Sequence, residues 1–132
     1  MKKRVQAYTL NELLVVLIII GVLILLALPA LMPLITRAKE TEAKLQLGHV
    51  WTLERGYFYT YSKYTDDLQA LGFEQQKLVT QGGHANYQIE IVSANANGFV
   101  ARATSVVDFN RNGVYNVWQI DQDKNLKEVT GD

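Results

Sequence analysis

The sequence predicts an α+β protein in which one long N-terminal helix packs on an antiparallel sheet of three or four strands. Three observations predict this fold class. An unbroken apolar run covers residues 13–35, an amphipathic helical pattern follows to about residue 61, and alternating segments separated by turn residues fill the chain from residue 87 onward. A helix with one apolar stripe and a sheet with one apolar face bury each other, so these elements form one small domain.

The apolar run is long enough to cross a membrane. From Leu13 to Ile35 the chain has no charged or amide side chain. At about 1.5 Å of rise per residue the run makes a helix of roughly 34 Å, and a hydrocarbon core is about 30 Å thick. The apolar core of a secretory signal peptide is shorter and ends at a small-x-small site, a spacing that Ala27 and Ala30 do not have.

The basic residues before this run predict its orientation. Lys2, Lys3 and Arg4 hold the N-terminus in the cytoplasm by the positive-inside tendency. We therefore expect one membrane-spanning helix, with everything after Thr36 outside the cytoplasm.

The membrane helix is predicted to continue outward as an amphipathic helix, because no Gly/Pro-rich break follows Ile35. Its apolar residues recur at helical steps and need a cover. They are Ala43, Leu47, Val50, Trp51, Tyr57, Phe58 and Tyr61. The charged residues are interpreted as a solvated opposite face. They are Arg37, Lys39, Glu40, Glu42, Lys44, Glu54 and Arg55.

The second half of the chain predicts a meander of three or four strands after a turn-rich connection. The connection, residues 62–86, is expected to contain one short helix from Asp66 to Leu71. Alternation of apolar and polar residues predicts strands at 87–92, 99–106, 114–120 and 126–129. Turn residues separate them at 95–98, 110–113 and 121–125.

Residues 7–16, Ala-Tyr-Thr-Leu-Asn-Glu-Leu-Leu-Val-Val, resemble the processing and assembly signature of the type IV pilin and pseudopilin superfamily. The resemblance covers residues 1–35 and implies cleavage by a prepilin peptidase between Ala7 and Tyr8, followed by N-methylation of Tyr8. Glu12 takes the place of the family's acidic residue. Gly21 and Pro29 match a Gly and a Pro that are common in its helix. Ala7 stands where Gly is usual, and Tyr8 where Phe or Met is commoner.

The resemblance also implies a domain organisation and partners. Residues 1–7 would be the leader peptide, residues 8–35 the transmembrane and assembly helix, and residues 36–132 an extracytoplasmic globular domain with the α+β pilin fold. The prepilin would sit in the cytoplasmic membrane and then enter an extracellular or periplasmic filament. Its partners would be the peptidase, an inner-membrane assembly platform and further copies of itself.

The expected function is that of a structural subunit of a type IV pilus. A pseudopilin of a type II secretion or DNA-uptake system shares the same signature, so the choice among motility, adhesion, secretion and uptake stays open. An alternative of another class is an uncleaved, signal-anchored membrane protein with a ligand-binding outer domain. That alternative predicts a retained leader and indifference to the loss of the Glu12 charge.

Glu12 is the first candidate functional residue. A carboxylate within lipid costs about 2.5–3.5 kcal/mol at the membrane centre and less near its edge, so it needs a partner. The resemblance implies that Glu12 pairs with the N-terminal amine of Tyr8 in a neighbouring subunit. A local alternative is a capping box formed by Thr9 and Glu12 at the start of the helix, and the two roles are compatible.

Pro29 and Pro33 each remove a hydrogen bond from the apolar helix. Curvature is one interpretation, since membrane helices tolerate proline. The resemblance implies another, in which the segment from Gly21 to Pro29 unwinds in the filament.

The outer domain offers one weak metal motif. Asp108, Asn110, Asn112 and Gly113 fit the first half of a calcium loop, but Gln119 stands where a bidentate Glu is required. An Asn-Gly turn between strands is the favoured interpretation, so no cofactor is expected and calcium is the weaker alternative.

Other features argue against catalysis and nucleic-acid binding. His49 and His84 are isolated from metal ligands and from any nucleophile that they could activate, so an enzyme is not expected. Removal of residues 1–7 takes away three of the 13 basic residues and leaves a net charge of −3, which does not favour nucleic acid. The chain has no cysteine, so packing, a metal or neighbouring subunits in a polymer must replace a disulfide.

Overall fold

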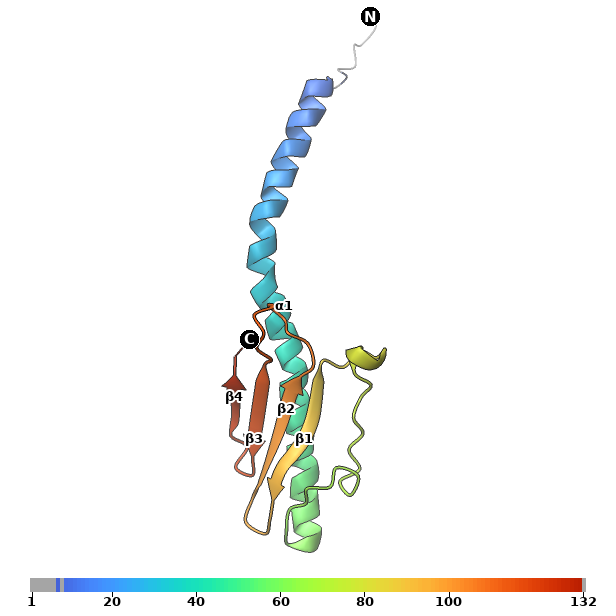
Figure 1. Ribbon diagram of the computed structural model, residues 1–132, viewed down its shortest axis with the longest axis vertical. Helices are drawn as coiled ribbons and strands as arrows, with labels where there is room; N and C mark the ends of the chain where they lie inside the picture. Colours follow the sequence, from blue (N-terminus) through green and yellow to red (C-terminus); the bar gives the residue numbers. More distant parts are fainter. Residues whose placement is uncertain (1–6, 8, 132) are drawn as a thin grey trace, which may run out of the picture. The chain divides into compact units, whose positions relative to one another are not determined.

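The computed structural model describes residue 7 and residues 9–131, and the chain divides into two compact units between Thr36 and Arg37. One helix, α1 (Leu10–Tyr61), supplies residues to both units (Figure 1). The Thr9 carbonyl oxygen accepts the N–H of Leu13 at 3.2 Å, which sets the start of the helix.

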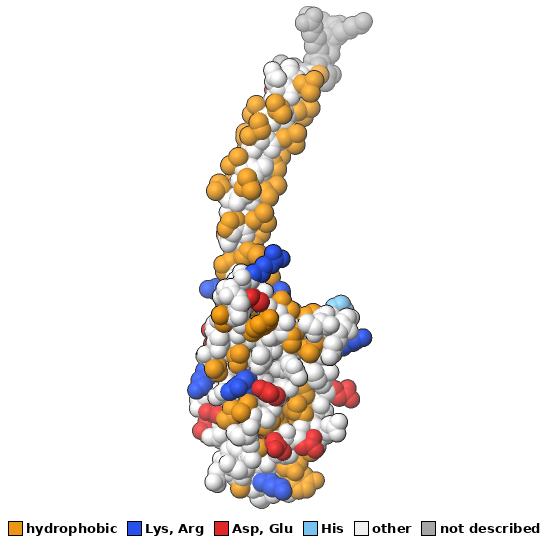
Figure 2. Space-filling model, viewed as in Figure 1, with side chains coloured by type: hydrophobic (Ala, Val, Ile, Leu, Met, Phe, Trp, Pro, Cys, Tyr) orange, Lys and Arg blue, Asp and Glu red, His pale blue; other side chains and the backbone are white. Residues whose placement is uncertain are grey.

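The first unit consists of the apolar part of α1. Every residue from Leu10 to Ile35 is exposed, and the most apolar window of the helix has a mean hydropathy of 3.3 (Figure 2). By length and composition α1 is able to cross a membrane, as the sequence predicts. Pro29 and Pro33 lie inside the helix without ending it.

The second unit contains a four-stranded antiparallel sheet in the order β1-β2-β3-β4. Its strands are β1 (Tyr87–Ala94), β2 (Phe99–Ser105), β3 (Val117–Asp121) and β4 (Leu126–Thr130). Each strand pairs with the next along the chain, so the predicted meander is confirmed. The third strand begins three residues later than predicted, and the Val114 N–H donates to Asn112 Oδ1 of the preceding turn at 2.7 Å instead of to a neighbouring strand.

The residues of α1 from Arg37 onward cover one face of this sheet and form the core with it (Figure 1). Ala43, Leu47 and Val50 are fully buried, which confirms the predicted stripe at its centre. Their partners from the sheet are Tyr87, Ile89, Phe99, Ala101, Ala103 and Ile120. The pattern on β2 alternates between buried and half-buried, as expected for a strand with one face on the core. The result is an α+β fold.

The ends of the helical pattern need two corrections. Tyr61 is 60% exposed instead of buried, because it is the last residue of α1 and its ring packs on Tyr57 with centroids 4.4 Å apart. Glu54, assigned to the solvated face, is fully buried. It lies four residues after Val50 and therefore on the same face of the helix.

The predicted short helix from Asp66 to Leu71 is wrong, because this segment forms only turns. The Asp67 side chain accepts the N–H of Gln69 at 2.9 Å, a local bond that competes with helix formation. Gly72 then takes a left-handed conformation with φ of +73° and ends the turn. The helical element of the connection lies further on, as the 3₁₀ turn η1 (Val79–Gln81).

Candidate assembly site

The start of α1 is closed by a capping box between Thr9 and Glu12. The Thr9 N–H donates to Glu12 Oε2 at 3.4 Å, and the Glu12 N–H donates to Thr9 Oγ1 at 3.3 Å. Each side chain thus satisfies one backbone N–H that the first turn would leave unpaired. The predicted capping arrangement is confirmed, and it places the carboxylate at the positive end of the helix dipole.

Glu12 is the only charged residue between Arg4 and Arg37. Arg37 follows it after 25 residues of helix, which corresponds to roughly 37 Å along the axis. No basic side chain further along α1 can therefore reach the carboxylate.

The other predicted site residues that the structure describes, Ala7, Gly21 and Pro29, are exposed. Ala7 is exposed, whereas Tyr8 lies outside the described residues. Gly21 has nothing within 4 Å of the position that a Cβ would occupy, and the segment from Gly21 to Pro29 is helical. Cleavage between Ala7 and Tyr8 and unwinding of this segment in a filament stay predictions.

Glu42 fastens α1 to the start of the sheet, although its charge suggested a solvated position. Glu42 Oε1 accepts the backbone N–H of Asn86 at 2.9 Å, and Oε2 accepts the side-chain amide of Asn86 at 3.0 Å. Hydrogen bonds to a charged group are worth about 1.5–3 kcal/mol, so this contact is a substantial one.

Asn116 is the polar residue that sequence reasoning missed altogether. It is fully buried, accepts the hydroxyl of Tyr87 at 2.6 Å, and donates through Nδ2 to Glu128 Oε1 at 2.7 Å and to the Thr130 carbonyl at 3.1 Å. The side chain therefore connects β1 with β4 in a chain that has no disulfide. Nothing in the sequence distinguishes Asn116 from the turn asparagines around it.

The calcium candidates Asp108, Asn110 and Asn112 do lie together in one turn, where their oxygens accept backbone N–H groups. The N–H of Asn112 contacts Asp108 Oδ1 at 3.2 Å and Asn110 Oδ1 at 3.0 Å, and the N–H of Gly113 contacts Asp108 Oδ2 at 2.6 Å. Among the described residues no group of three or more His, Cys, Asp or Glu could hold a metal. A calcium site stays a prediction, with Asn side chains as most of its ligands.

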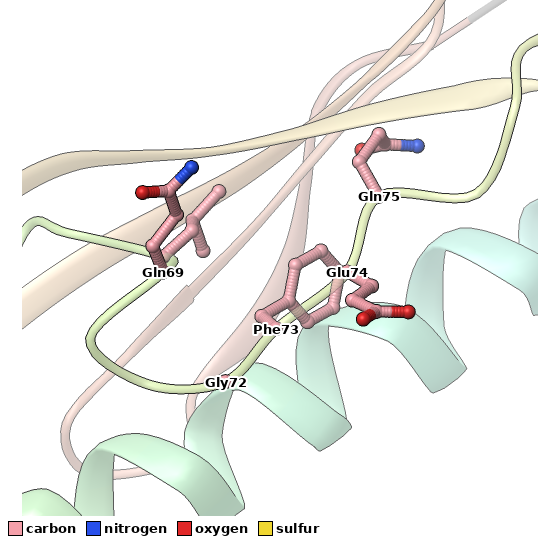
Figure 3. A pocket seen from close by; sticks show the side chains of 6 residues that line it. Gln69, Gly72, Phe73, Glu74 and Gln75 are labelled. Atoms are coloured by element: carbon pink, nitrogen blue, oxygen red, sulfur yellow. The ribbon is translucent and has the colours of Figure 1, made fainter.

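The connection before β1, at residues 68–75, borders an open pocket of about 660 Å³ (Figure 3). Its lining residues are Leu68, Gln69, Gly72, Phe73, Glu74 and Gln75. The Gln75 side chain donates to the Tyr87 carbonyl at 3.1 Å and accepts the Ile89 N–H at 2.8 Å, so it covers the edge of β1. Glu74 is the one carboxylate among these lining residues, and the His49 ring lies 5.8 Å from the ring of Phe73, another of them.

Comparison with known proteins gives a sequence similarity to one type IV pilin. No protein-family model matches the chain. Over 92 residues the chain is 28% identical to the type IV major pilin protein PilA of Myxococcus xanthus (strain DK1622). The match covers 70% of this chain and 40% of that protein. The chain is pilin-like.

The pilin-like domain also carries a cluster of cations and aromatic rings that the sequence did not reveal. The Arg55 guanidinium lies 5.5 Å from the centre of the Trp51 ring and 5.3 Å from that of Tyr59. Lys124 Nζ lies 4.9 Å from the Trp51 ring, and the Trp51 indole N–H donates to the Gln122 carbonyl at 3.0 Å. These contacts attach the β3–β4 turn to α1 of the pilin-like chain.

Proposed function

We propose that this pilin-like protein is the structural subunit of a type IV pilus filament. It is cut between Ala7 and Tyr8 by a prepilin peptidase, N-methylated at Tyr8, and polymerised through residues 8–35 by an inner-membrane platform. The observation that carries the proposal is the single carboxylate of Glu12 at the start of a helix whose residues are all exposed from Leu10 to Ile35. The similarity to a type IV major pilin supports a structural, non-enzymatic role.

The exposed apolar part of α1 needs apolar surroundings both before assembly, in the membrane, and after assembly, in the filament. Lipid covers it in the membrane. Outside the membrane each Leu, Ile or Val left in water forgoes about 1.5–3 kcal/mol, and other copies of the same helix are the available apolar surface. Burial against neighbouring subunits therefore favours the filament once the helix leaves the bilayer.

Glu12 gives this packing its register. Cleavage before Tyr8 creates a free amine near the start of the helix, which is the one cation that every subunit would bring to this depth. At 4 Å such a pair is favourable by roughly 4 kcal/mol at an effective dielectric constant of 20, before the cost of desolvation. An uncleaved leader would replace that amine by a neutral peptide bond and remove the partner.

The intact mass of the protein recovered from the cell envelope tests the proposal. The expected mass corresponds to a chain that starts at Tyr8 and carries one methyl group. A full-length mass would contradict the proposal and favour a signal-anchored membrane protein instead.

A further inference from the structure

Two turns of the outer domain contain the dipeptide Asn-Gly, at Asn97–Gly98 and at Asn112–Gly113. In such a dipeptide the backbone nitrogen of Gly can attack the side-chain amide carbon of Asn, because Gly has no side chain to hinder the approach. The attack is slow unless a base takes the proton of that nitrogen and a donor polarises the amide carbonyl. The surroundings of the two turns therefore decide their reactivity.

At Asn112–Gly113 both requirements are met. The Gly113 N–H, the incoming nucleophile, donates to the Asp108 carboxylate through Oδ2 at 2.6 Å. Asn112 Oδ1, the oxygen of the amide under attack, accepts the Val114 N–H at 2.7 Å. Gly113 has φ of +84°, and nothing lies within 4 Å of the position of a Cβ, so the exposed turn has room for a ring to close.

At Asn97–Gly98 the base is missing. The Gly98 N–H donates to Asn95 Oδ1 at 3.0 Å, and the oxygen of a neutral amide does not take up a proton at ordinary pH. The side chain of Gln122 also stands close to Gly98, where a Cβ would lie 2.5 Å from its Oε1. The chain thus holds the same dipeptide in a turn at residues 95–98, where the Gly N–H donates to an amide oxygen instead of a carboxylate.

We propose that Asn112–Gly113 is a self-deamidating site at which Asp108 acts as the general base. The Gly113 N–H proton moves to Asp108 Oδ2 as the nitrogen forms a bond to Asn112 Cγ. The Val114 N–H stabilises the negative charge that develops on Oδ1. The proton passes from Asp108 to the side-chain nitrogen, the Cγ–N bond breaks, ammonia leaves, and a succinimide remains.

Water then opens the succinimide ring at either of its carbonyl groups. The product is aspartate in a normal backbone or isoaspartate in a backbone lengthened by one carbon. Either product adds one carboxylate to a turn that already contains Asp108. Subunits of different age would then differ in surface charge, whichever machine they belong to.

The test follows both asparagines in the full-length protein, purified in detergent and incubated in water enriched in oxygen-18. Peptide mapping by mass spectrometry measures the labelled carboxylate at residues 112 and 97 over time. In the unmodified chain Asn112 should react faster than Asn97. Asp108→Asn should slow the reaction at Asn112 by about tenfold or more. The loss should stay below the roughly 100-fold that a well-placed general base contributes, because the new Asn side chain can still accept the Gly113 N–H.

Asn110→Ala is the matched control. It removes another acceptor of the Asn112 N–H in the same turn and leaves the contact between Asp108 and Gly113 in place. Its rate should equal or exceed that of the unmodified chain. The proposal is overturned if Asp108→Asn leaves the rate unchanged or raises it. It is also overturned if Asn97 reacts as fast as Asn112 in the unmodified chain, a comparison that needs no variant.

Discussion

At the scale of single residues, Glu12 combines two tasks that one substitution can separate. Glu12→Gln keeps an oxygen that can accept the Thr9 N–H but removes the charge. We expect the variant to insert in the membrane normally and to form several-fold fewer filaments, because the N-terminal amine of the neighbour loses its partner. Electron microscopy of sheared filaments, with immunoblots of the membrane fraction, measures both quantities.

Thr9→Ala is the complementary variant. It removes the hydroxyl that accepts the Glu12 N–H, at a cost of about 0.5–2 kcal/mol to the helix start, and leaves the charge in place. Filament numbers should fall less than in Glu12→Gln. Normal filament numbers in Glu12→Gln would exclude charge pairing as the basis of register.

Glu54 makes the stability of the outer domain depend on pH. Burial raises the pKa of its carboxyl group to about 7, and the nearby Asp66 adds to the rise, although the backbone N–H of Thr65 opposes it. Oε1 has no hydrogen-bond partner among the described residues. The folded chain therefore binds a proton that the unfolded chain has already released at intermediate pH.

The proton that Glu54 binds in the folded state determines whether the stability of the domain rises or falls with pH. The folded-state pKa lies above the unfolded value of 4.5, so the stabilisation is complete below pH 4.5 and is lost as pH rises through 7. The loss amounts to about 3 kcal/mol by the pKa difference. Denaturant unfolding of the full chain in detergent at pH 5 and pH 8 measures it. Glu54→Gln should flatten the profile, and an unchanged profile in that variant would contradict this origin.

At the scale of elements, Asn116 holds the last strand to the first. Asn116→Ala leaves the Tyr87 hydroxyl and Glu128 without their buried partner, so we expect a loss of about 1–3 kcal/mol in the free energy of unfolding. Asn125→Ala is a suitable control, because Asn125 makes its side-chain bond to Asp121 in an exposed turn. Equal effects of the two variants would show that the buried network contributes no special stability.

The sequence predicts the elements better than it predicts the polar contacts between them. The stripe of Ala43, Leu47 and Val50 and the alternation in β2 are local patterns, so they identify the core faces. Asn116 is buried only because of what the tertiary fold places over it, and no local pattern indicates that. Glu54 lies at helical spacing from Val50 on the buried face, but its charge argues for the solvated one. The helix predicted from Asp66 to Leu71 is absent for another reason. The Asp67 side chain accepts the Gln69 N–H, and this local hydrogen bond competes with helix formation.

The candidate site divides in the same way. Thr9 and Glu12 are three residues apart, so their capping box could be predicted from spacing alone. The contact between the Gly113 N–H and Asp108 depends on how the backbone of residues 108–113 folds back on itself. From the sequence, the spacing of these residues indicates only the first half of a calcium loop. In this chain, contacts between residues close in sequence could thus be predicted from the sequence, and contacts that depend on the tertiary fold could not.

At the scale of the whole molecule, the chain combines a folded domain that buries its apolar residues with a helix that exposes them from Leu10 to Ile35. Such a chain is incomplete as a monomer in water. If the leader controls when the helix leaves the membrane, cleavage after residue 7 commits the subunit to the filament. The side chain at position 7 then decides whether the subunit stays in the membrane or enters the filament.

Ala7 allows this idea to be tested with two substitutions. Ala7→Leu enlarges the small side chain before the cut, so we expect a full-length chain that stays in the membrane fraction and forms no filaments. Ala7→Gly supplies the residue that is usual in the type IV pilin superfamily and should be processed at least as fully as the unmodified chain. Intact mass and filament counts are compared for both variants. Filaments built from full-length Ala7→Leu chains would show that the free amine of Tyr8 is unnecessary, and the pairing partner of Glu12 would then have to be sought elsewhere.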